Sequence, residues 1–348
     1  MQNVDVTLLL IGDAGAPDPT FEPVLAALTR DASAQPGRTV VAFLGDNIYP
    51  RGMPPERDPE RPEAERRLDA QLAVLRRSGA RGIFVPGNHD WAKHEADGWD
   101  AVRRQEAYIA SHGGALAVML PKGGCPGPAA MDVSVTLRLL VLDTQWWLHD
   151  GPKPNGTGSG CAAASPGALT DSLRGALRDA GHRLVAVLAH HPLRSGGPHG
   201  GEFGWMDHLF PLRRLSGKLW VPLPVIGSGY PLARKAGISS QDLGSSEYGL
   251  MRDSLRAAFL ARPPLLFAGG HDHSLQVLRG HVVRYHVVTG AGTFGHVSPV
   301  EYLAETQFAR SASGYVRFDL LQTGRGRLSV IQVDQAGTAR EVYSQWLD

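Results

Sequence analysis

Two histidines lie either side of an aspartate in the segment LFAGGHDHSLQ, residues 266–276. An apolar run and three small residues precede them, so His271 and His273 follow the end of an expected buried strand. A His-x-His pair at a strand end can bind metal ions, but polar loops also contain such pairs by chance. Other parts of the chain must decide between these two interpretations.

Residues of the same kind follow other apolar, β-branched runs. The runs are VTLLLIGD, TVVAFLGDN, GIFVPGNHD, LRLLVLDT, RLVAVLAHH, LLFAGGHDH and RYHVVTGAG. Continuous runs of this length are typical of strands buried on both faces in α/β proteins. Ligands of open α/β sheets bind beyond the carboxyl ends of the strands. The sequence therefore predicts a polar cluster there, made of Asp13, Asp46, Asn88, His89, His190, His271 and His273.

The elements that must position this cluster are strands alternating with helices. Apolar residues at helical spacing predict helices over residues 20–33, 63–78, 167–180 and 246–261. This alternation favours an α/β fold with a largely parallel sheet between helices. The tail, residues 314–348, has alternating polarity and short Gly-containing turns, which predict antiparallel strands.

No internal repeat or composition break divides the chain, so we expect a single domain over residues 1–348. Residues 195–250 are rich in Gly, Pro and aromatic side chains. A segment this long between two expected strands is usually a lid or binding loop, and the alternative is a small subdomain that covers a sheet edge.

Composition excludes several classes of protein. The chain has 348 residues, of which 43% are hydrophobic and 20% charged, as in an ordinary globular protein. A net charge of +1 gives no electrostatic footprint for nucleic acid or a membrane surface. No apolar run is long enough to insert into a bilayer, and the first residues predict a strand rather than a signal peptide. The oligomeric state is not predicted.

Two cysteines, Cys125 and Cys161, lie in small-residue loops on either side of the run VTLRLLVLDTQWW. The pattern fits a disulfide formed in an oxidising compartment, and it fits two separate free thiols equally well. Neither cysteine has the spacing of a metal ligand.

The residue types in the cluster indicate its chemistry. Carboxylates, one amide oxygen and several imidazoles suit two di- or trivalent cations of intermediate hardness, rather than calcium or a Cys-type structural zinc. A single Asp or His after a strand is most often a cap or turn residue. Five strand ends that all carry possible metal ligands are harder to explain as unrelated cap or turn residues.

The motifs GDAG, GDNIY, GNHD, VLAH and GHDH occur in this order between about residues 5 and 295. They resemble those of the calcineurin-like metallophosphoesterases and, more narrowly, those of the purple acid phosphatases. The resemblance implies a four-layer α/β/β/α sandwich, in which two mixed sheets pack face to face with helices outside. It also implies a binuclear metal centre.

Matched motif by motif, the resemblance implies that Asp46 bridges two metal ions. The first metal would also bind Asp13 and His273, and the second would bind Asn88, His190 and His271.

The narrower resemblance depends on two positions. Most of the superfamily has a histidine ligand at the position of Gly15, and Tyr49 replaces this ligand three residues after Asp46. A metal-bound phenol must lose its proton, which a strongly Lewis-acidic ion promotes. The resemblance therefore implies Fe(III) at the Tyr49 site and Fe, Zn or Mn at the second, while the alternative for Tyr49 is a packed loop aromatic.

The implied activity is hydrolysis of a small phosphorylated substrate, most readily a phosphate monoester. Two cations that share a carboxylate lower the pKa of a bound water, and the resulting hydroxide attacks phosphorus in line. His89 resembles the family's catalytic histidine that is not a ligand, and we expect Asp90 to orient or charge its imidazole. His199 lies nine residues after His190, at about the offset of a substrate-contacting histidine, and is expected to protonate the leaving oxygen.

The expected substrate contacts are Asn88, His199 and Arg194, although a solvated loop position is the commoner alternative for Arg194. The roles of His191 and of His296, which follows another strand-end loop, stay open.

Two other functions remain open: a phosphodiesterase acting on nucleotides or glycerophosphodiesters, and a non-catalytic relative that binds metal or phosphate. Purple acid phosphatases are typically extracytoplasmic, which weakly favours a periplasmic or secreted protein, although this chain shows no signal peptide.

Overall fold

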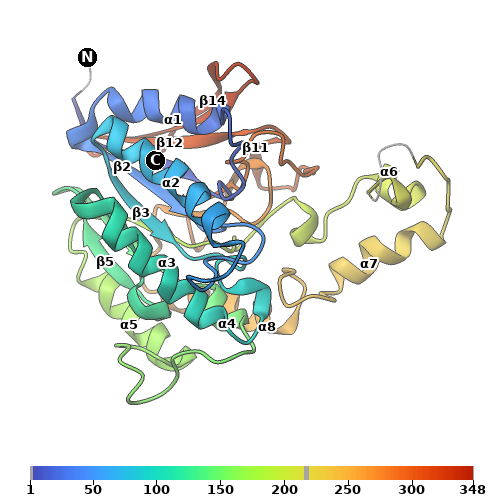
Figure 1. Cartoon of the computed structure of the whole chain (residues 1–348), viewed down its shortest axis with the longest axis horizontal. Coiled ribbons are helices and arrows are strands. Elements are labelled where there is room, and N and C mark those ends of the chain that lie inside the picture. Colours follow the sequence, from blue (N-terminus) through green and yellow to red (C-terminus); the bar gives the residue numbers. More distant parts are fainter. Residues whose placement is uncertain (1–2, 215–218, 348) are drawn as a thin grey trace.

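Two seven-stranded mixed sheets face each other, with helices on the outer side of each (Figure 1). The computed structural model describes residues 3–214 and 219–347. Residues 215–218, which belong to the predicted lid segment, and residues 1, 2 and 348 lie outside the described residues. The four-layer α/β/β/α sandwich expected from the sequence is confirmed.

The first sheet has the strand order β14-β13-β12-β1-β2-β3-β4. Strands β1 to β4 are parallel neighbours, whereas β12 to β14 continue the sheet in antiparallel pairs. The bounds are β1 (Val4–Ile11), β2 (Thr39–Leu44), β3 (Arg81–Val85), β4 (Ala117–Met119), β12 (Gly314–Leu321), β13 (Gly326–Val333) and β14 (Ala339–Leu347). The outer helices of this half are α1 (Pro23–Ser33), α2 (Arg61–Ser78) and α3 (Gly98–Gly113).

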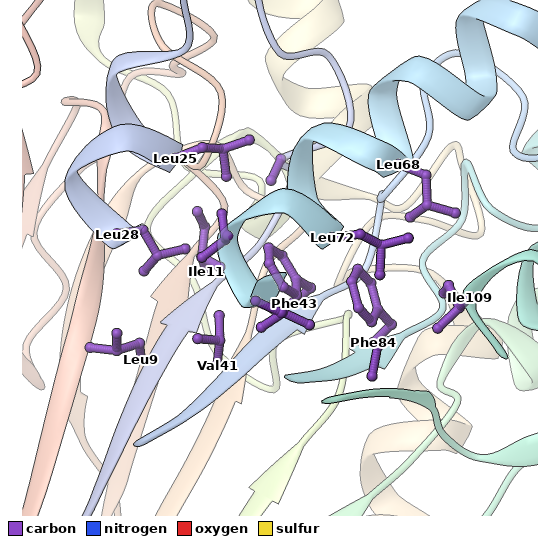
Figure 2. Packing of buried hydrophobic residues seen from close by; sticks show 14 of the residues in the cluster. Leu9, Ile11, Leu25, Leu28, Val41, Phe43, Leu68, Leu72, Phe84 and Ile109 are labelled. Atoms are coloured by element: carbon purple, nitrogen blue, oxygen red, sulfur yellow. The ribbon is translucent and has the colours of Figure 1, made fainter. Parts of the chain in front are cut away.

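The apolar faces of α1 and α2 cover the outer face of this sheet (Figure 2). Leu28 and Leu72 pack over a row of large side chains that includes Phe43 and Phe84, whose rings stack with centroids 4.5 Å apart. Full burial of each such side chain stabilises the fold by about 1.5–3 kcal/mol. The helices therefore hold the parallel strands, and with them the loops that follow β1, β2 and β3.

The second sheet has the order β11-β9-β10-β8-β7-β6-β5, and its central strands β6, β7, β8 and β10 are parallel. Its strands are β5 (Ala129–Asp132), β6 (Leu137–Val141), β7 (Leu184–Leu188), β8 (Leu266–Gly269), β9 (Leu275–Arg279), β10 (Tyr285–Thr289) and β11 (Thr306–Arg310). The helices of this half are α4 (Gln145–Leu148), α5 (Pro166–Arg178) and α8 (Ser246–Phe259). Ser165 and Ser245 cap α5 and α8 through their side-chain oxygens.

The parallel strands are apolar throughout because both of their faces are buried. In β1, Leu8 and Leu10 belong to the core between the sheets, whereas Leu9 and Ile11 face the outer helices. Residues of β6 and β10, such as Leu139 and Val287, complete the inner core from the opposite sheet. This double burial explains why the predicted strands read as continuous apolar runs.

A long arm between β7 and α8 extends away from the sheets (Figure 1). It carries two short helices, α6 (Trp205–Leu209) and α7 (Gly229–Lys235). Short 3-10 turns lie at Pro36–Arg38, Ala92–His94, Gly114–Leu116, Lys122–Gly124, Pro198–Gly200, Pro211–Arg214 and Ile226–Ser228. None of the helices in the described part of the chain is long and apolar enough to cross a membrane.

Cys125 and Cys161 form a disulfide, with their Cα atoms 5.5 Å apart. Of the two alternatives left by the sequence, the structure therefore has the bridge. The bridge joins residues 36 positions apart and encloses β5, β6 and α4.

Replacing both cysteines with serine is expected to lower the free energy of unfolding by about 3–4 kcal/mol, because the open chain gains the entropy of a loop of this length. Urea denaturation of the oxidised protein and of Cys125→Ser/Cys161→Ser measures this difference. Reduction of the wild-type protein should reproduce the loss and should leave the double variant unchanged. Equal urea midpoints for all samples would contradict a stabilising bridge.

Candidate metal centre

The predicted ligands meet where the two sheets come together. Loops that follow β1, β2 and β3 bring Asp13, Asp46 and Asn88, all of which are buried. Loops that follow β7 and β8 bring His190, His271 and His273 from the second sheet. The two sheets therefore contribute different ligand types, oxygen from the first and nitrogen from the second.

The first half of the cluster contains Tyr49, Asp13 and His273. The Tyr49 hydroxyl lies 3.0 Å from Asp13 Oδ1 and 3.3 Å from His273 Nε2. His273 Nε2 lies 3.2 Å from the same Asp13 oxygen. A phenol, a carboxylate and an imidazole thus converge on one point, as the ligands of a single ion do.

The second half contains Asn88, His190 and His271. Asn88 Oδ1 lies 3.0 Å from His190 Nε2 and 3.1 Å from His271 Nδ1. Asp46 connects the two halves, because its Oδ1 is 3.5 Å from His190 Nε2 and ligand atoms of Asp13, Asp46 and His190 all lie within 4.8 Å of one another. The two ligand sets are therefore adjacent and share a carboxylate.

Backbone carbonyls orient the two histidines of the second half. His190 Nδ1 lies 2.8 Å from the carbonyl oxygen of Leu44, and His271 Nε2 lies 2.9 Å from that of Gln241. A carbonyl oxygen only accepts, so each of these nitrogens carries a proton. The other nitrogen of each ring then presents a lone pair to the cluster, as in the outer contacts of metal-binding histidines.

Three predicted ligands have left-handed backbone conformations, with φ values of 58° for Asp13, 53° for Asp46 and 70° for His271. They make up three of the seven non-glycine residues with positive φ in the described part of the chain. Such conformations are unfavourable for residues with a Cβ and are found most often at functional sites. The surrounding structure holds them, for example through the hydrogen bond from the His271 amide to Asp13 Oδ2 (2.9 Å).

The structure also gives a physical reason for Gly15, where the resemblance would place a histidine. A Cβ added to Gly15 would overlap the backbone of Asp46, Asn47 and Ile48. The Tyr49 amide donates to the Gly15 carbonyl at 3.1 Å, so the two loops are in direct contact. A side chain is therefore excluded at this position, and Tyr49 reaches the cluster from the adjacent loop.

Protonation in the cluster reflects concentrated negative charge. Burial, together with the carboxylates of Asp13 and Asp46, raises the pKa of Tyr49 well above its usual range. Burial opposes a charge on His190, but Asp46 and Asp13 outweigh it and raise the pKa of this imidazole. The carboxylates thus draw protons onto neighbouring groups, and bound cations would supply the same charge compensation.

The expectation for Asp90 needs correction. Its carboxylate accepts hydrogen bonds from the amides of Asn47 (3.0 Å), Ile48 (3.2 Å) and Gly87 (2.8 Å), rather than from His89. Burial, followed by Asp46, raises the pKa of Asp90 to about 7. Asp90 therefore shapes the loop that carries Asp46, while the Pro50 carbonyl, 2.6 Å from His89 Nδ1, orients that imidazole.

His89 and His199 lie at the edge of the cluster and keep some solvent exposure. His89 Nε2 is 3.8 Å from Asp46 Oδ2. The His199 ring lies 3.9 Å from that of His271, and its Nδ1 is 3.2 Å from Asp242 Oδ1. The structure therefore brings both predicted catalytic histidines to the ligand set.

The arm supplies contacts that sequence reasoning missed. Arg234 forms an ion pair with the buried Asp242 at 2.6 Å, and its Nη2 also lies 3.0 Å from His199 Nδ1. Because arginine only donates, a proton on His199 Nδ1 is directed to Asp242 Oδ1 or to the Gln241 carbonyl oxygen, each 3.2 Å away. No motif or periodicity in the sequence marks Arg234, Asp242 or Gln241.

Two further histidines differ in their surroundings. Both ring nitrogens of His191 have hydrogen-bond partners, Thr144 Oγ1 (2.9 Å) and Gln241 Oε1 (2.8 Å), although one of them also lies within 4.8 Å of ring nitrogens of His190 and His271. The His296 ring lies 4.0 Å from His273 and 5.3 Å from Tyr49, and its buried Nδ1 has no hydrogen-bond partner among the described residues. His296 thus belongs to the surroundings of the first half.

Arg194, an expected substrate contact, lies elsewhere. It pairs with Glu305 and lines a separate cavity with Arg252. Arg51, another loop arginine near the motifs, pairs with Glu95 at 2.9 Å. The structure therefore brings neither arginine to the cluster, and the prediction for Arg194 is corrected.

Comparison of the whole chain with known proteins identifies the fold. No protein-family model matches the chain, and no curated protein matches it by sequence. Among solved structures, a dimetal phosphatase from Danio rerio superposes with a TM-score of 0.51 and 14% identity, covering 99% of each chain. A purple acid phosphatase from yellow lupin (Lupinus luteus) seeds superposes with a TM-score of 0.56 and 12% identity. The chain has the fold of the calcineurin-like metallophosphoesterases.

A third structural neighbour is GAP50, described as the anchor in the inner membrane complex of Plasmodium. It superposes with a TM-score of 0.59 and 14% identity, and the match covers 99% of this chain and 89% of that protein. The match to the lupin enzyme covers 99% of this chain but only 54% of the enzyme. At these identities the likeness establishes the metallophosphoesterase fold, and the ligand geometry must carry any statement about chemistry.

Replacing Asp90 with alanine is expected to lower the free energy of unfolding by at least about 3 kcal/mol, because three buried amides lose their acceptor at about 1–3 kcal/mol each. It should also weaken metal binding, since the loop that carries Asp46 is no longer held. Urea denaturation and metal titration measure the two effects.

The matched control is Asp319→Ala, which removes another buried carboxylate, one that accepts from Thr7 at 2.6 Å far from the cluster along β1. The control should lose stability and keep its metal affinity. Unchanged metal affinity in Asp90→Ala would contradict the role given to Asp90.

Proposed function

We propose that the protein is a binuclear-metal phosphatase that hydrolyses phosphate monoesters of small molecules. The observation that carries the proposal is the position of Asp46 between two adjacent ligand sets. One set is Asp13, Tyr49 and His273, and the other is Asn88, His190 and His271. The Tyr49 hydroxyl favours Fe(III) in the first set, whereas the oxygen and nitrogen ligands of the second suit Fe, Zn or Mn.

Two cations bound by these residues would supply Lewis acidity toward a phosphate ester and make water a better nucleophile. The chain's own contribution is to position the ester and move a proton. His89 Nδ1 donates to the Pro50 carbonyl, so its Nε2, which lies near Asp46, donates to a phosphate oxygen when the ring carries a second proton. Asn88 adds an amide group beside the same position.

His199 is the proposed acid for the leaving oxygen. Asp242 fixes the Nδ1 side of the ring, and Arg234 compensates the charge of Asp242. When both ring nitrogens are protonated, Asp242 balances the charge of the imidazolium, and Nε2 supplies the proton that is transferred to the leaving oxygen, which becomes an alcohol. The partial exposure of His199, with 28% of its side chain accessible, gives a substrate access to this nitrogen.

A second candidate is a non-catalytic protein that uses the same fold, which the description of GAP50 as an anchor favours. We also propose an extracytoplasmic location, periplasmic or secreted, since the Cys125–Cys161 bridge is of the kind that forms in oxidising compartments.

His199→Ala is expected to lower kcat by about 10²–10⁴-fold for an alkyl phosphate, because general acid catalysis contributes this much when the leaving oxygen needs a proton. The loss should be much smaller for 4-nitrophenyl phosphate, whose leaving group departs without protonation. Initial rates of the metal-loaded protein with both esters and with bis-4-nitrophenyl phosphate give the result. His182→Ala, an exposed histidine outside the site, is the control.

Equal losses of kcat for both monoesters in His199→Ala would contradict the role of His199 as the acid. Faster hydrolysis of the diester than of the monoesters would show that the protein is a phosphodiesterase rather than a phosphomonoesterase. Two bound metal ions with no hydrolysis of any of the three esters would favour the non-catalytic candidate.

Tyr49→Phe tests the metal assignment. Wild-type protein loaded with iron should show a broad visible absorption band in the green to yellow region, from charge transfer between the Tyr49 phenolate and Fe(III). The band should disappear in Tyr49→Phe and persist in Tyr302→Phe, an exposed tyrosine near β11. A spectrum without the band at full metal loading would contradict Tyr49 as a ligand of ferric iron.

A further inference from the structure

A cavity of about 560 Å³ lies on the outer side of the second sheet, between α8, the β9–β10 hairpin and the loop before β11. The charged and polar side chains in its wall are Arg194, Arg252, Arg256, Arg279, His281, His286 and Glu305. Its volume falls within the range of about 300–1,000 Å³ that small-molecule sites occupy.

The cavity is separate from the metal centre. His286 in its wall is paired with Phe267 in the β10–β8 ladder, four residues before His271. At about 3.3 Å per residue, this spacing places the cavity roughly 13 Å along the strand from the cluster. Phe267 belongs to the outer core beneath α8, and its ring contacts that of His286. The His286 side chain therefore lies on the outer face of the second sheet, away from the core between the sheets.

Positive charge in the cavity is largely uncompensated. Glu305 pairs with Arg194, and Arg279 donates to the Tyr285 hydroxyl at 2.9 Å. Among the described residues, no acidic side chain lies within ion-pair distance of Arg252 or Arg256. These two arginines are spaced i,i+4 on α8, an arrangement in which like charges destabilise a helix.

The exposed Arg194 and the buried His286 both respond to this excess of positive charge. Burial, followed by Arg252 and Arg256, lowers the pKa of Arg194. Burial, followed by Arg194, lowers the pKa of His286 to about 4, so its imidazole is neutral. His286 is only 8% exposed, and its Nδ1 has no hydrogen-bond partner among the described residues. An unsatisfied polar atom beside unpaired arginines is costly unless a ligand compensates it.

We propose that this cavity binds a small phosphorylated molecule, with its phosphate held by Arg252 and Arg256. Guanidinium groups form paired, charge-assisted hydrogen bonds with phosphate oxygens, and a phosphate dianion offers enough of them for more than one arginine. Leu193 and Val283 form an apolar part of the wall, against which the organic part of the ligand packs. The site is independent of the phosphatase activity proposed above.

The test counts binding sites on the full-length, metal-loaded protein with phenylphosphonate, which carries a phosphorus dianion on an apolar ring and resists hydrolysis. Equilibrium dialysis of Arg252→Gln/Arg256→Gln is expected to show one equivalent fewer than the wild type, or affinity for that equivalent at least about tenfold weaker, since charge-assisted hydrogen bonds are lost. Arg256→Gln alone, at an exposed position, should weaken the same equivalent.

The matched control is Arg174→Gln/Arg178→Gln, which removes two arginines at the same i,i+4 spacing from α5. It should bind as many equivalents as the wild type. The comparison does not depend on the metal centre: if that centre binds no phosphonate, the wild type binds one equivalent and Arg252→Gln/Arg256→Gln binds none.

Identical stoichiometry and affinity in the wild type and in Arg252→Gln/Arg256→Gln would overturn the proposal. Inorganic phosphate is the second probe, because free phosphate has the same charged group without the apolar part. Phenylphosphonate should bind this site more tightly than inorganic phosphate. Equal affinities for phenylphosphonate and inorganic phosphate would contradict an organic ligand and would indicate that the cavity binds free phosphate.

Discussion

The proposed metal centre depends on the packing of one sheet against the other. Its oxygen ligands follow strands of the first sheet, and its imidazoles follow strands of the second. Hydrogen bonds across this junction include His190 to the Leu44 carbonyl and the His271 amide to Asp13. A Cβ added to Gly12 would lie 2.8 Å from Gly270 Cα, so the two strand ends meet without intervening side chains. Neither half of the molecule alone would hold a complete ligand set.

The same junction contains strained backbone conformations and buried charged groups, which a fold optimised for stability alone would avoid. Asp13, Asp46 and His271 have left-handed backbones, and buried carboxylates lie beside a phenol and several imidazoles. Left-handed conformations of such residues cost of order 1–3 kcal/mol each and persist only where the surroundings impose them. The Asp90 carboxylate provides one such constraint, because it accepts hydrogen bonds from the amide of Asn47, next to Asp46, and from the amide of Gly87, next to Asn88. Strain and concentrated charge at one place are consistent with a site maintained for chemistry.

Much of this arrangement could be predicted because parallel strands align their carboxyl ends. Each apolar run ends in a polar residue, so positions far apart in sequence, such as Asp13 and His271, were expected to meet. The orientation of individual side chains could not be predicted in the same way. Asp90 follows His89 directly, yet its carboxylate faces the opposite loop. Helix α3 was not predicted from the sequence, although Val102, Tyr108 and Ile109 on its buried face recur at helical spacing.

The arm was the least predictable part, yet it contributes to the centre where it rejoins the body. The Gln241 carbonyl orients His271, and Asp242 orients His199, so adjacent residues hold a proposed ligand and the proposed acid. Arg234 on α7 pairs with Asp242 and ties this segment to the arm. Because the arm carries few buried apolar contacts, its sequence can vary without loss of the core. Changes in the arm can therefore alter the shape of the proposed substrate site while the contacts at Gln241 and Asp242 keep His271 and His199 in position.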